Sequence, residues 1–162
     1  MEHEEYTRDN YPTSGKKYNG EKAIIGYDKI ILFGVFDFFH LGHLRLFKQA
    51  KMEADYLIVA VQDSNFVQKF KPDSTVLYTT EQKLELLNSI KEIDKVITYT
   101  EATTGFLETQ DFDILGLGED QIGDRWNILI KWCENHNKKI VRFKRTKNIS
   151  SSDIKFQMKI FQ

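Results

Sequence analysis

The stretch Ile30–Lys51, IILFGVFDFFHLGHLRLFKQAK, decides the fold that this sequence predicts. Its continuous apolar run Ile30–Phe33 indicates a buried strand, and Gly34 starts a turn after that strand. His40 and His43 follow at the head of a helical pattern. The first backbone N–H groups of a helix lack intrahelical partners and carry the positive end of the helix dipole. This junction therefore predicts a site for an anion such as phosphate.

Composition narrows the possible partners. The chain has 162 residues, of which 41% are hydrophobic and 29% charged, as expected for one globular domain. Its 23 Lys and Arg nearly balance its 24 Asp and Glu, so no overall field favours nucleic acid or an acidic membrane, and cations for a phosphate must be placed locally. The single cysteine, Cys133, excludes an internal disulfide and favours a reducing compartment.

The hydropathy pattern predicts no membrane attachment. No run approaches the ~20 apolar residues of a membrane helix, and the polar start of the chain lacks the apolar core of a signal peptide. We therefore expect a cytoplasmic protein. Residues 1–27 show no clear period and are expected to form an N-terminal extension that is flexible or packs on a neighbour, followed by the domain proper at 28–162.

Apolar runs and helical patterns alternate along the domain. The expected strands are Lys29–Phe33, Tyr56–Val61, Lys95–Tyr99, Ile114–Leu117 and Lys139–Phe143. The expected helices are Leu41–Lys51, a helix capped by Thr80 and running to about Lys91, a short one around Thr103–Gln110, Arg125–Asn135, and a last one ending near Ile160, while residues 62–79 are expected to form an irregular loop.

This alternation predicts a Rossmann-like α/β fold, a doubly wound parallel five-stranded sheet with helices on both faces. Ligands of such sheets bind beyond the carboxyl ends of the strands, near the point where the strand order reverses. The histidine segment, Gly118–Gln121 and Arg145–Ser152 all follow a predicted strand. We therefore expect them to share one site.

The spacing of His40 and His43 puts both side chains on the same side of a helix start, and Gly42 leaves room for a ligand beside them. From these residues alone, a pair of partly buried structural histidines is an equal alternative. A zinc site is not expected, because no third histidine, cysteine or clear carboxylate ligand lies nearby in the sequence.

Two motifs together identify a family. GVFDFFHLGH resembles the GxFDxxHxGH signature of the cytidylyltransferase family, within the nucleotidyltransferase superfamily, and is most similar to the bacterial glycerol-3-phosphate cytidylyltransferases. Arg145–Ser151, RTKNISS, resembles the second family signature, RTxGIST. The two motifs stand in the family's order, each between a strand and a helix, and the resemblance covers about Asp28 to Met158.

The resemblance implies that CMP is transferred from CTP to a small polyol phosphate, with glycerol phosphate favoured. The products would be pyrophosphate and a CDP-polyol for a surface polymer such as teichoic acid or capsule. It also implies Mg²⁺ that arrives with CTP, no metal ligands of the protein's own, and a homodimer. An acceptor phosphate, with a second pKa of about 6, is already a nucleophile at neutral pH. Such an enzyme must therefore mainly align two anions and balance their charge.

The resemblance also assigns roles to residues. The catalytic set is His40, His43, Lys69 and Arg145. The nucleotide-binding set is Gly34, Val35, Phe36, Gly42, Lys83, Gly118, Arg145, Thr146, Ile149, Ser150 and Ser151. The substrate-binding set is Lys69, Lys71, Asp120 and Gln121.

Several positions depart from the family pattern or allow a structural alternative. Lys83 stands where the family has an arginine and lacks the bidentate fork of that side chain. Asn148 replaces a glycine but tolerates a left-handed turn, and Gln121 replaces an aromatic residue, which indicates a different acceptor. Lys69 and Lys71 are alternatively solvated loop lysines.

Other features fit structural roles as well. Ser150, with Asp153 three residues on, predicts a helix cap, and Gly118–Gln121 is alternatively a solvated turn. Trp126 and Cys133 fit helix packing.

Three other functions stay open at this stage. The same chemistry with ATP is the nearest, although RTKNISSS favours CTP. A nucleotide-binding regulatory module without catalysis is suggested by Lys83 and Asn148, and a flavin-binding or electron-transfer module is the third. The acceptor is not identified either: glycerol 3-phosphate, glycerol 2-phosphate, a longer polyol phosphate, phosphocholine and phosphoethanolamine offer the same nucleophile. Phosphocholine would require an aromatic cage or acidic groups around its cation.

Overall fold

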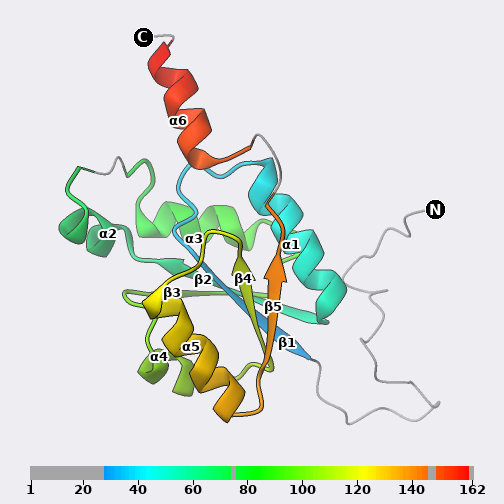
Figure 1. Cartoon of the computed structure of the whole chain (residues 1–162). Helices are drawn as coiled ribbons and strands as arrows, with labels where there is room; N and C mark the ends of the chain where they lie inside the picture. The colour runs from blue at the N-terminus through cyan, green and yellow to red at the C-terminus, as the bar shows by residue number, and fades with distance from the viewer. Residues whose placement is uncertain (1–27, 74–75, 146–148, 161–162) are drawn as a thin grey trace, which may run out of the picture.

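The protein forms one parallel sheet with helices on both faces (Figure 1). The computed structural model describes residues 28–73, 76–145 and 149–160. Five strands lie in the order β3-β2-β1-β4-β5. Their bounds are Lys29–Gly34 (β1), Tyr56–Gln62 (β2), Lys95–Tyr99 (β3), Ile114–Gly118 (β4) and Lys139–Phe143 (β5). The predicted Rossmann-like five-stranded sheet is confirmed.

The sheet positions a ligand site through its central strand. β1 is buried on both faces because its run Ile30–Phe33 is apolar throughout. It pairs with β2 from Lys29 opposite Tyr56 to Gly34 opposite Val61, and with β4 on its other side. The strand order reverses between β1 and β4, so the segments that follow these two strands diverge and leave an opening at their carboxyl ends.

The helices divide between the two faces. On one face lie α1 (Leu41–Glu53) and α3 (Thr80–Asn88), which contribute Phe47 and Leu87 to a core with Ile30 and Leu32. On the other face lie α4 (Thr104–Glu108) and α5 (Asp124–Asn135), whose side chains Leu107, Leu129 and Cys133 pack against Ile31 and Phe33. The two-faced core that the strand pattern predicts is thus present.

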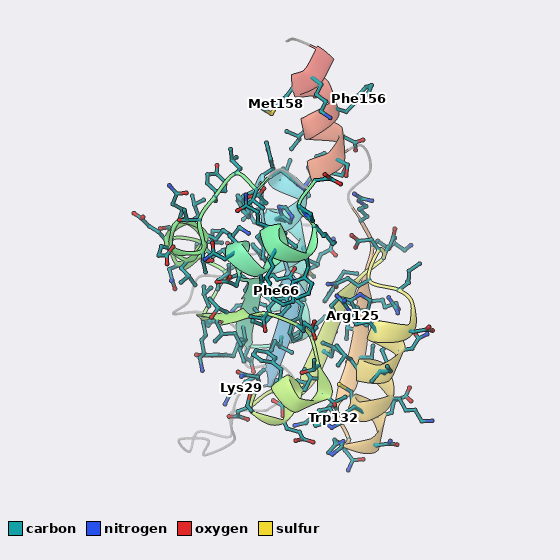
Figure 2. All side chains as sticks on the ribbon, turned by 90° about the vertical axis from the view of Figure 1, so that its left-hand side faces the viewer. Lys29, Phe66, Arg125, Trp132, Phe156 and Met158 are labelled. Atoms are coloured by element: carbon teal, nitrogen blue, oxygen red, sulfur yellow. The ribbon has the colours of Figure 1, made fainter. Side chains whose placement is uncertain are left out.

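Helix α6 (Ser151–Ile160) extends away from this body (Figure 1). Figure 2 shows Phe156 and Met158 on this helix, outside the main body, and both are exposed. Within the described part of the chain, no helix is both long and apolar enough to cross a membrane. The predicted N-terminal extension, residues 1–27, lies outside the described residues.

Two predictions between β2 and α3 are wrong. Residues 62–79 contain a helix, α2 (Ser64–Phe70), which is capped by Asp63 through a bond from the Phe66 amide (3.0 Å). A segment of seven residues with few buried side chains shows too little hydrophobic periodicity to predict a helix.

The predicted cap of α3 is displaced by one residue. Thr79 caps the helix in a reciprocal arrangement with Gln82, and the helix ends at Asn88. The Thr80 hydroxyl is engaged elsewhere: it donates to Asp63 (3.0 Å) and accepts from the Ser64 amide (2.9 Å). Either threonine could cap from sequence alone, and the contacts with α2 decide between them.

Candidate active site

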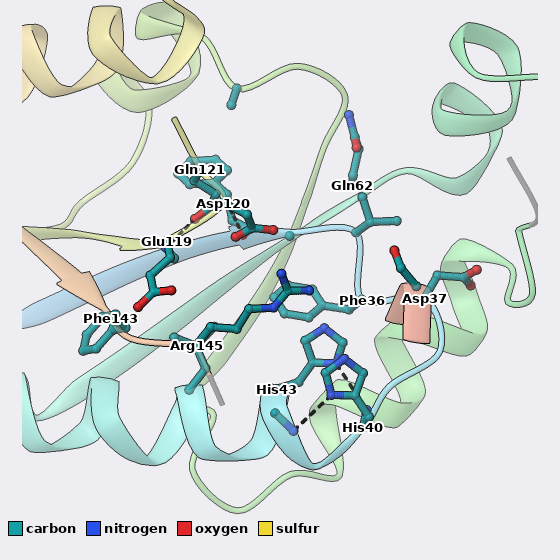
Figure 3. Close-up of a pocket in the computed structure, with 18 of the residues that line it drawn as sticks. Phe36, Asp37, His40, His43, Gln62, Glu119, Asp120, Gln121, Phe143 and Arg145 are labelled. Carbon is teal, nitrogen blue, oxygen red and sulfur yellow. Dashed lines mark hydrogen bonds between the residues drawn. The ribbon is translucent and has the colours of Figure 1, made fainter. Parts of the chain in front are cut away.

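A cavity of about 620 Å³ opens at the carboxyl edge of the sheet (Figure 3). The segments that follow β1, β4 and β5 form its walls, together with the first turns of α1, α5 and α6. The histidine segment, the Gly118–Gln121 turn and the Arg145 segment therefore meet in one place. The prediction of one shared location for these segments is confirmed.

The turn after β1 has an unusual backbone. Phe36 and Phe38 have positive φ angles, 52° and 50°, which non-glycine residues rarely adopt. The Phe36 ring folds back over Gly34, where a Cβ atom would stand 2.6 Å from the ring. A side chain at position 34 would therefore push the Phe36 ring from its buried place. Strained residues of this kind cluster at functional sites.

His40 and His43 cap helix α1 together. The Gly42 amide donates to His40 Nδ1 (3.0 Å), and the His40 amide donates to His43 Nδ1 (3.2 Å) (Figure 3). Since both Nδ1 atoms accept hydrogen bonds, the proton of each neutral ring lies on Nε2. The rings stack with centroids 3.9 Å apart. The histidines are thus fixed as two neighbouring N–H donors, and this structural role is compatible with the predicted functional one.

Both imidazoles are held in the neutral form. Burial, followed by the neighbouring His40, lowers the pKa of His43 to about 3. Burial, followed by the positive charge of Arg145, lowers the pKa of His40. At neutral pH the pair therefore offers hydrogen bonds to an anion without carrying a positive charge itself. Arg145, which lines the same cavity, supplies the charge.

The second motif forms the opposite wall. Figure 3 shows the Arg145 side chain extending into the cavity, and Ile149 and Ser152 line it from the start of α6. Ser150 is buried and caps α6: its hydroxyl donates to Asp153 (2.6 Å) and accepts from the Asp153 amide (3.0 Å). The predicted cap is confirmed.

The side chain of Gln121 stabilises the turn that follows β4. Gln121 accepts from the Gly118 amide and donates to the Phe33 carbonyl, both at 2.9 Å, and so bridges the ends of β4 and β1. From outside, the Arg142 guanidinium donates to the carbonyls of Gly118 (3.3 Å) and Gln121 (3.1 Å). Both ends of the Gln121 amide are thus bonded to backbone, although the residue lines the cavity as predicted.

The predicted site residues fall into three groups. Those that line the cavity are Gly34, Val35, Phe36, His40, Gly42, His43, Lys71, Gly118, Asp120, Gln121, Arg145 and Ile149. Lys69, Lys83 and Ser150 do not line it. Thr146 lies outside the described residues, and of Ser151 only the backbone is described. The roles assigned to all of these residues stay predictions.

The three residues away from the cavity have other surroundings. Lys69 is exposed on the last turn of α2, with its ammonium 5.8 Å from the centre of the Phe70 ring. Lys83 is only 1% exposed within α3. Ser150 is occupied by its cap. A ligand would have to displace these contacts, or the segments would have to move, before these residues could touch it.

Asp37 is a site residue whose role the sequence did not reveal. It lies in the first motif, and its buried carboxylate accepts from the amides of Leu77 (2.9 Å and 3.1 Å) and Tyr78 (3.0 Å). It thereby ties the segment before α3 to the turn that carries the histidines. No local sequence pattern predicts a hydrogen bond between residues so far apart in the chain.

Sequence reasoning also missed part of the lining. Tyr99 at the end of β3, Glu119, the first-turn residues Arg125 and Trp126 of α5, and Lys144 after β5 all line the cavity. In the sequence, Trp126 belongs to the apolar stripe of its predicted helix, and Arg125 has the pattern of an exposed helix residue. Only the convergence of the strand ends distinguishes them. In the described ranges, no three His, Cys, Asp or Glu side chains converge to hold a metal ion.

Known proteins are similar to this chain in sequence and in fold. A family model described as Cytidylyltransferase-like matches residues 31–157. The chain is 32% identical over 133 residues to the glycerol-3-phosphate cytidylyltransferase of Bacillus spizizenii, which covers 80% of this chain and 96% of that protein. It is 33% identical over 134 residues to the enzyme of the same name from Staphylococcus aureus, covering 80% and 94%.

A solved structure has a similar fold. The lipopolysaccharide core biosynthesis protein from Thermoplasma volcanium superposes with a TM-score of 0.65 and 26% identity, over 75% of this chain and all (100%) of that chain. The family model spans most of the described domain, from β1 to α6, and includes both motifs. The chain therefore belongs to the cytidylyltransferase-like family of enzymes.

Proposed function

We propose that this enzyme transfers CMP from CTP to a small polyol phosphate, with glycerol phosphate favoured, and releases pyrophosphate. The observation that carries the proposal is the pair of neutral imidazoles at the start of α1, each with Nδ1 bonded to a backbone amide and Nε2 left to donate. Two relatives at 32% and 33% identity are named glycerol-3-phosphate cytidylyltransferase, which supports this acceptor.

In the proposed reaction, a phosphate oxygen of the acceptor attacks the α-phosphorus of CTP. A new P–O bond forms, the bond between the α-phosphorus and the bridging oxygen breaks, and its electron pair leaves with pyrophosphate. No proton has to be removed from the acceptor, because the phosphate is already ionised. His40 and His43 donate from Nε2 to the oxygens where negative charge develops, and Arg145 balances that charge.

The cavity contains cations suited to two bound anions. Lys71, Lys144 and Arg145 line it on the side of the two motifs, and Arg125 lines it from α5. These residues provide the local positive charge that the overall net charge of −1 lacks. Holding both phosphates in line in this field supplies the orientation that the reaction needs.

Mg²⁺ accompanying CTP belongs to the same proposal. Asp120 and Glu119 are exposed carboxylates that line the cavity and could supply an oxygen ligand, whereas the Asp37 carboxylate already accepts backbone hydrogen bonds. A magnesium ion bound in this way takes most of its ligands from phosphate oxygens and water. When bound, it would neutralise part of the triphosphate charge. A homodimer and a role in surface polymer synthesis are proposed from the family resemblance, and a cytoplasmic location is proposed from the hydropathy pattern.

A panel of nucleoside triphosphates tests the proposal. With glycerol 3-phosphate as acceptor, CTP should give pyrophosphate and CDP-glycerol, detected by mass spectrometry, while ATP, GTP and UTP give little. Release with ATP alone would establish an adenylyltransferase instead. Binding of CTP without turnover of any acceptor would favour the regulatory module.

A further inference from the structure

The cavity has a second region on the α4 and α5 face of the sheet. His43 contacts Phe36, which belongs to the core under α1. Tyr99 and Trp126 also line the cavity, but they pack with Phe33 in the core under α4 and α5. The cavity therefore passes over the carboxyl edge of the sheet, from the histidines on one face to an aromatic region on the other.

The aromatic region consists of Phe33, Tyr99 and Trp126. The rings of Tyr99 and Trp126 meet Phe33 edge-on, with centroids 5.0 Å and 6.1 Å from its own. Aromatic rings gathered in a pocket are a common binding site for an ammonium group, above all for the quaternary ammonium of choline. Taken alone, these rings would favour phosphocholine as the acceptor.

Arg125 reverses this preference. It lies in the first turn of α5 (Figure 2) and lines the cavity beside Trp126. Tyr99 and Arg125 line the same cavity, and the positive charge of Arg125 partly offsets the rise that burial causes in the pKa of Tyr99. No residue within the described ranges makes a hydrogen bond or ion pair with the Arg125 side chain. Its exposed guanidinium therefore lines the cavity without a direct ion pair.

On the basis of the proposed function, we infer that Arg125 is a specificity-determining residue that rejects acceptors with a cationic head group and accepts those with an uncharged polyol. An ammonium placed against Tyr99 and Trp126 would share the cavity with the guanidinium of Arg125, and like charges repel. A hydroxyl group in the same place can accept a hydrogen bond from Arg125. The acceptor class is thus a polyol phosphate rather than an amino-alcohol phosphate.

Glu119 and Asp120 would oppose the effect of Arg125 on an ammonium group, because both are exposed carboxylates that line the same cavity. Carboxylates near the acceptor would attract an ammonium and weaken the discrimination. Their effect is separable from that of Arg125, because Asp120→Asn and Arg125→Gln change the charge of the cavity in opposite directions.

The test compares glycerol 3-phosphate with phosphocholine on five proteins: the unmodified chain, Arg125→Gln, Arg125→Lys, Asp120→Asn and Lys131→Gln. Lys131 is exposed on the same helix and does not line the cavity, so it matches the charge change of Arg125→Gln at a distant place. Acceptor affinity is measured by calorimetry, and turnover with CTP by pyrophosphate release. The binding measurement does not depend on CTP chemistry, so failure of the proposed function and failure of this inference are distinguishable.

We expect the unmodified protein to bind glycerol 3-phosphate at least about tenfold more tightly than phosphocholine. Arg125→Gln should reduce that ratio to near one, while Arg125→Lys, which keeps the charge, and Lys131→Gln should retain it. Equal or tighter binding of phosphocholine by the unmodified protein would overturn the inference. So would an Arg125→Gln ratio equal to that of the unmodified protein, whereas a further fall in phosphocholine affinity in Asp120→Asn would support the opposing role of the acid.

Discussion

At the scale of single residues, the two histidines of the first motif show how a backbone can set a side chain's chemistry. Their Nδ1 atoms accept from the amides of Gly42 and His40, so Nε2 is the donor on each ring. Burial keeps the His43 pKa at about 3, so that the ring stays neutral through the physiological range. A neutral, oriented donor requires no reorganisation as charge develops on a phosphate oxygen.

Replacing His43 by alanine should therefore remove catalysis rather than binding. We expect His43→Ala to lower kcat by about 100-fold or more, as for other single donors to a developing oxyanion. CTP affinity should change little, because Arg145 and the α1 backbone amides remain. Calorimetry with CTP, circular dichroism and turnover would separate the effects; unchanged turnover would refute the role assigned to His43.

At the scale of elements, the first turn of α1 combines a histidine capping box with a glycine that leaves room for it. A Cβ atom on Gly42 would lie 2.8 Å and 2.9 Å from Cε1 and Nδ1 of His40. The glycine therefore gives the His40 ring the space to lie against the helix start and accept from the Gly42 amide. Glycine in a helix otherwise costs about 1 kcal/mol relative to alanine.

Gly42→Ala should accordingly separate activity from stability. We expect turnover to fall about 100-fold because the His40 ring must shift, while thermal unfolding occurs at the same or a higher temperature. Gly105→Ala in α4 is the matched control, since its nearest neighbour, Thr103 Oγ1, stands 3.9 Å from the added Cβ. A Gly42→Ala enzyme that is as active as the control would contradict the packing argument.

At the scale of the whole molecule, β4 joins the two halves of the sheet through a glycine. A Cβ atom on Gly116 would stand 2.4 Å from Leu32 and 3.0 Å from Phe143, both in the core. Gly116→Ala should lower the free energy of unfolding by about 1–3 kcal/mol through overpacking. Urea unfolding followed by fluorescence would measure this loss, and an unchanged midpoint would show that the core adapts without cost.

The stability of the folded protein should also depend on pH through His43. Its pKa falls from 6.5 to about 3 on folding, so the unfolded chain binds the proton more readily. The contribution is fully present above pH 6.5 and is lost progressively as the pH falls toward 3. Between pH 7 and pH 5 the unmodified protein should lose about 2 kcal/mol more than His43→Asn. Urea titrations of both proteins at the two pH values test this, and parallel losses would contradict it.

Much of the architecture could be predicted because short segments of the sequence determine it. The apolar run Ile30–Phe33, the other four strand segments and the amphipathic helices predicted the five-stranded sheet, and β3 and β5 have the predicted bounds. The helix α2 was missed because its seven residues bury few side chains. The sequence favours Thr80 as a cap because its partners in the structure, Asp63 and Ser64, lie well before it in the chain.

The candidate site shows the same division. By itself the sequence determined which chemical groups stand at strand ends: the two motifs have fixed spacing, and the strand-to-helix junction is a local feature. Only the tertiary structure decided that Asp37 anchors the segment before α3, that Gln121 bridges β4 and β1, and that Arg125 and Tyr99 line one cavity. Their partners lie far away in the chain, so no local pattern encodes the contact, and it exists only once the parallel strands bring their carboxyl ends to one edge.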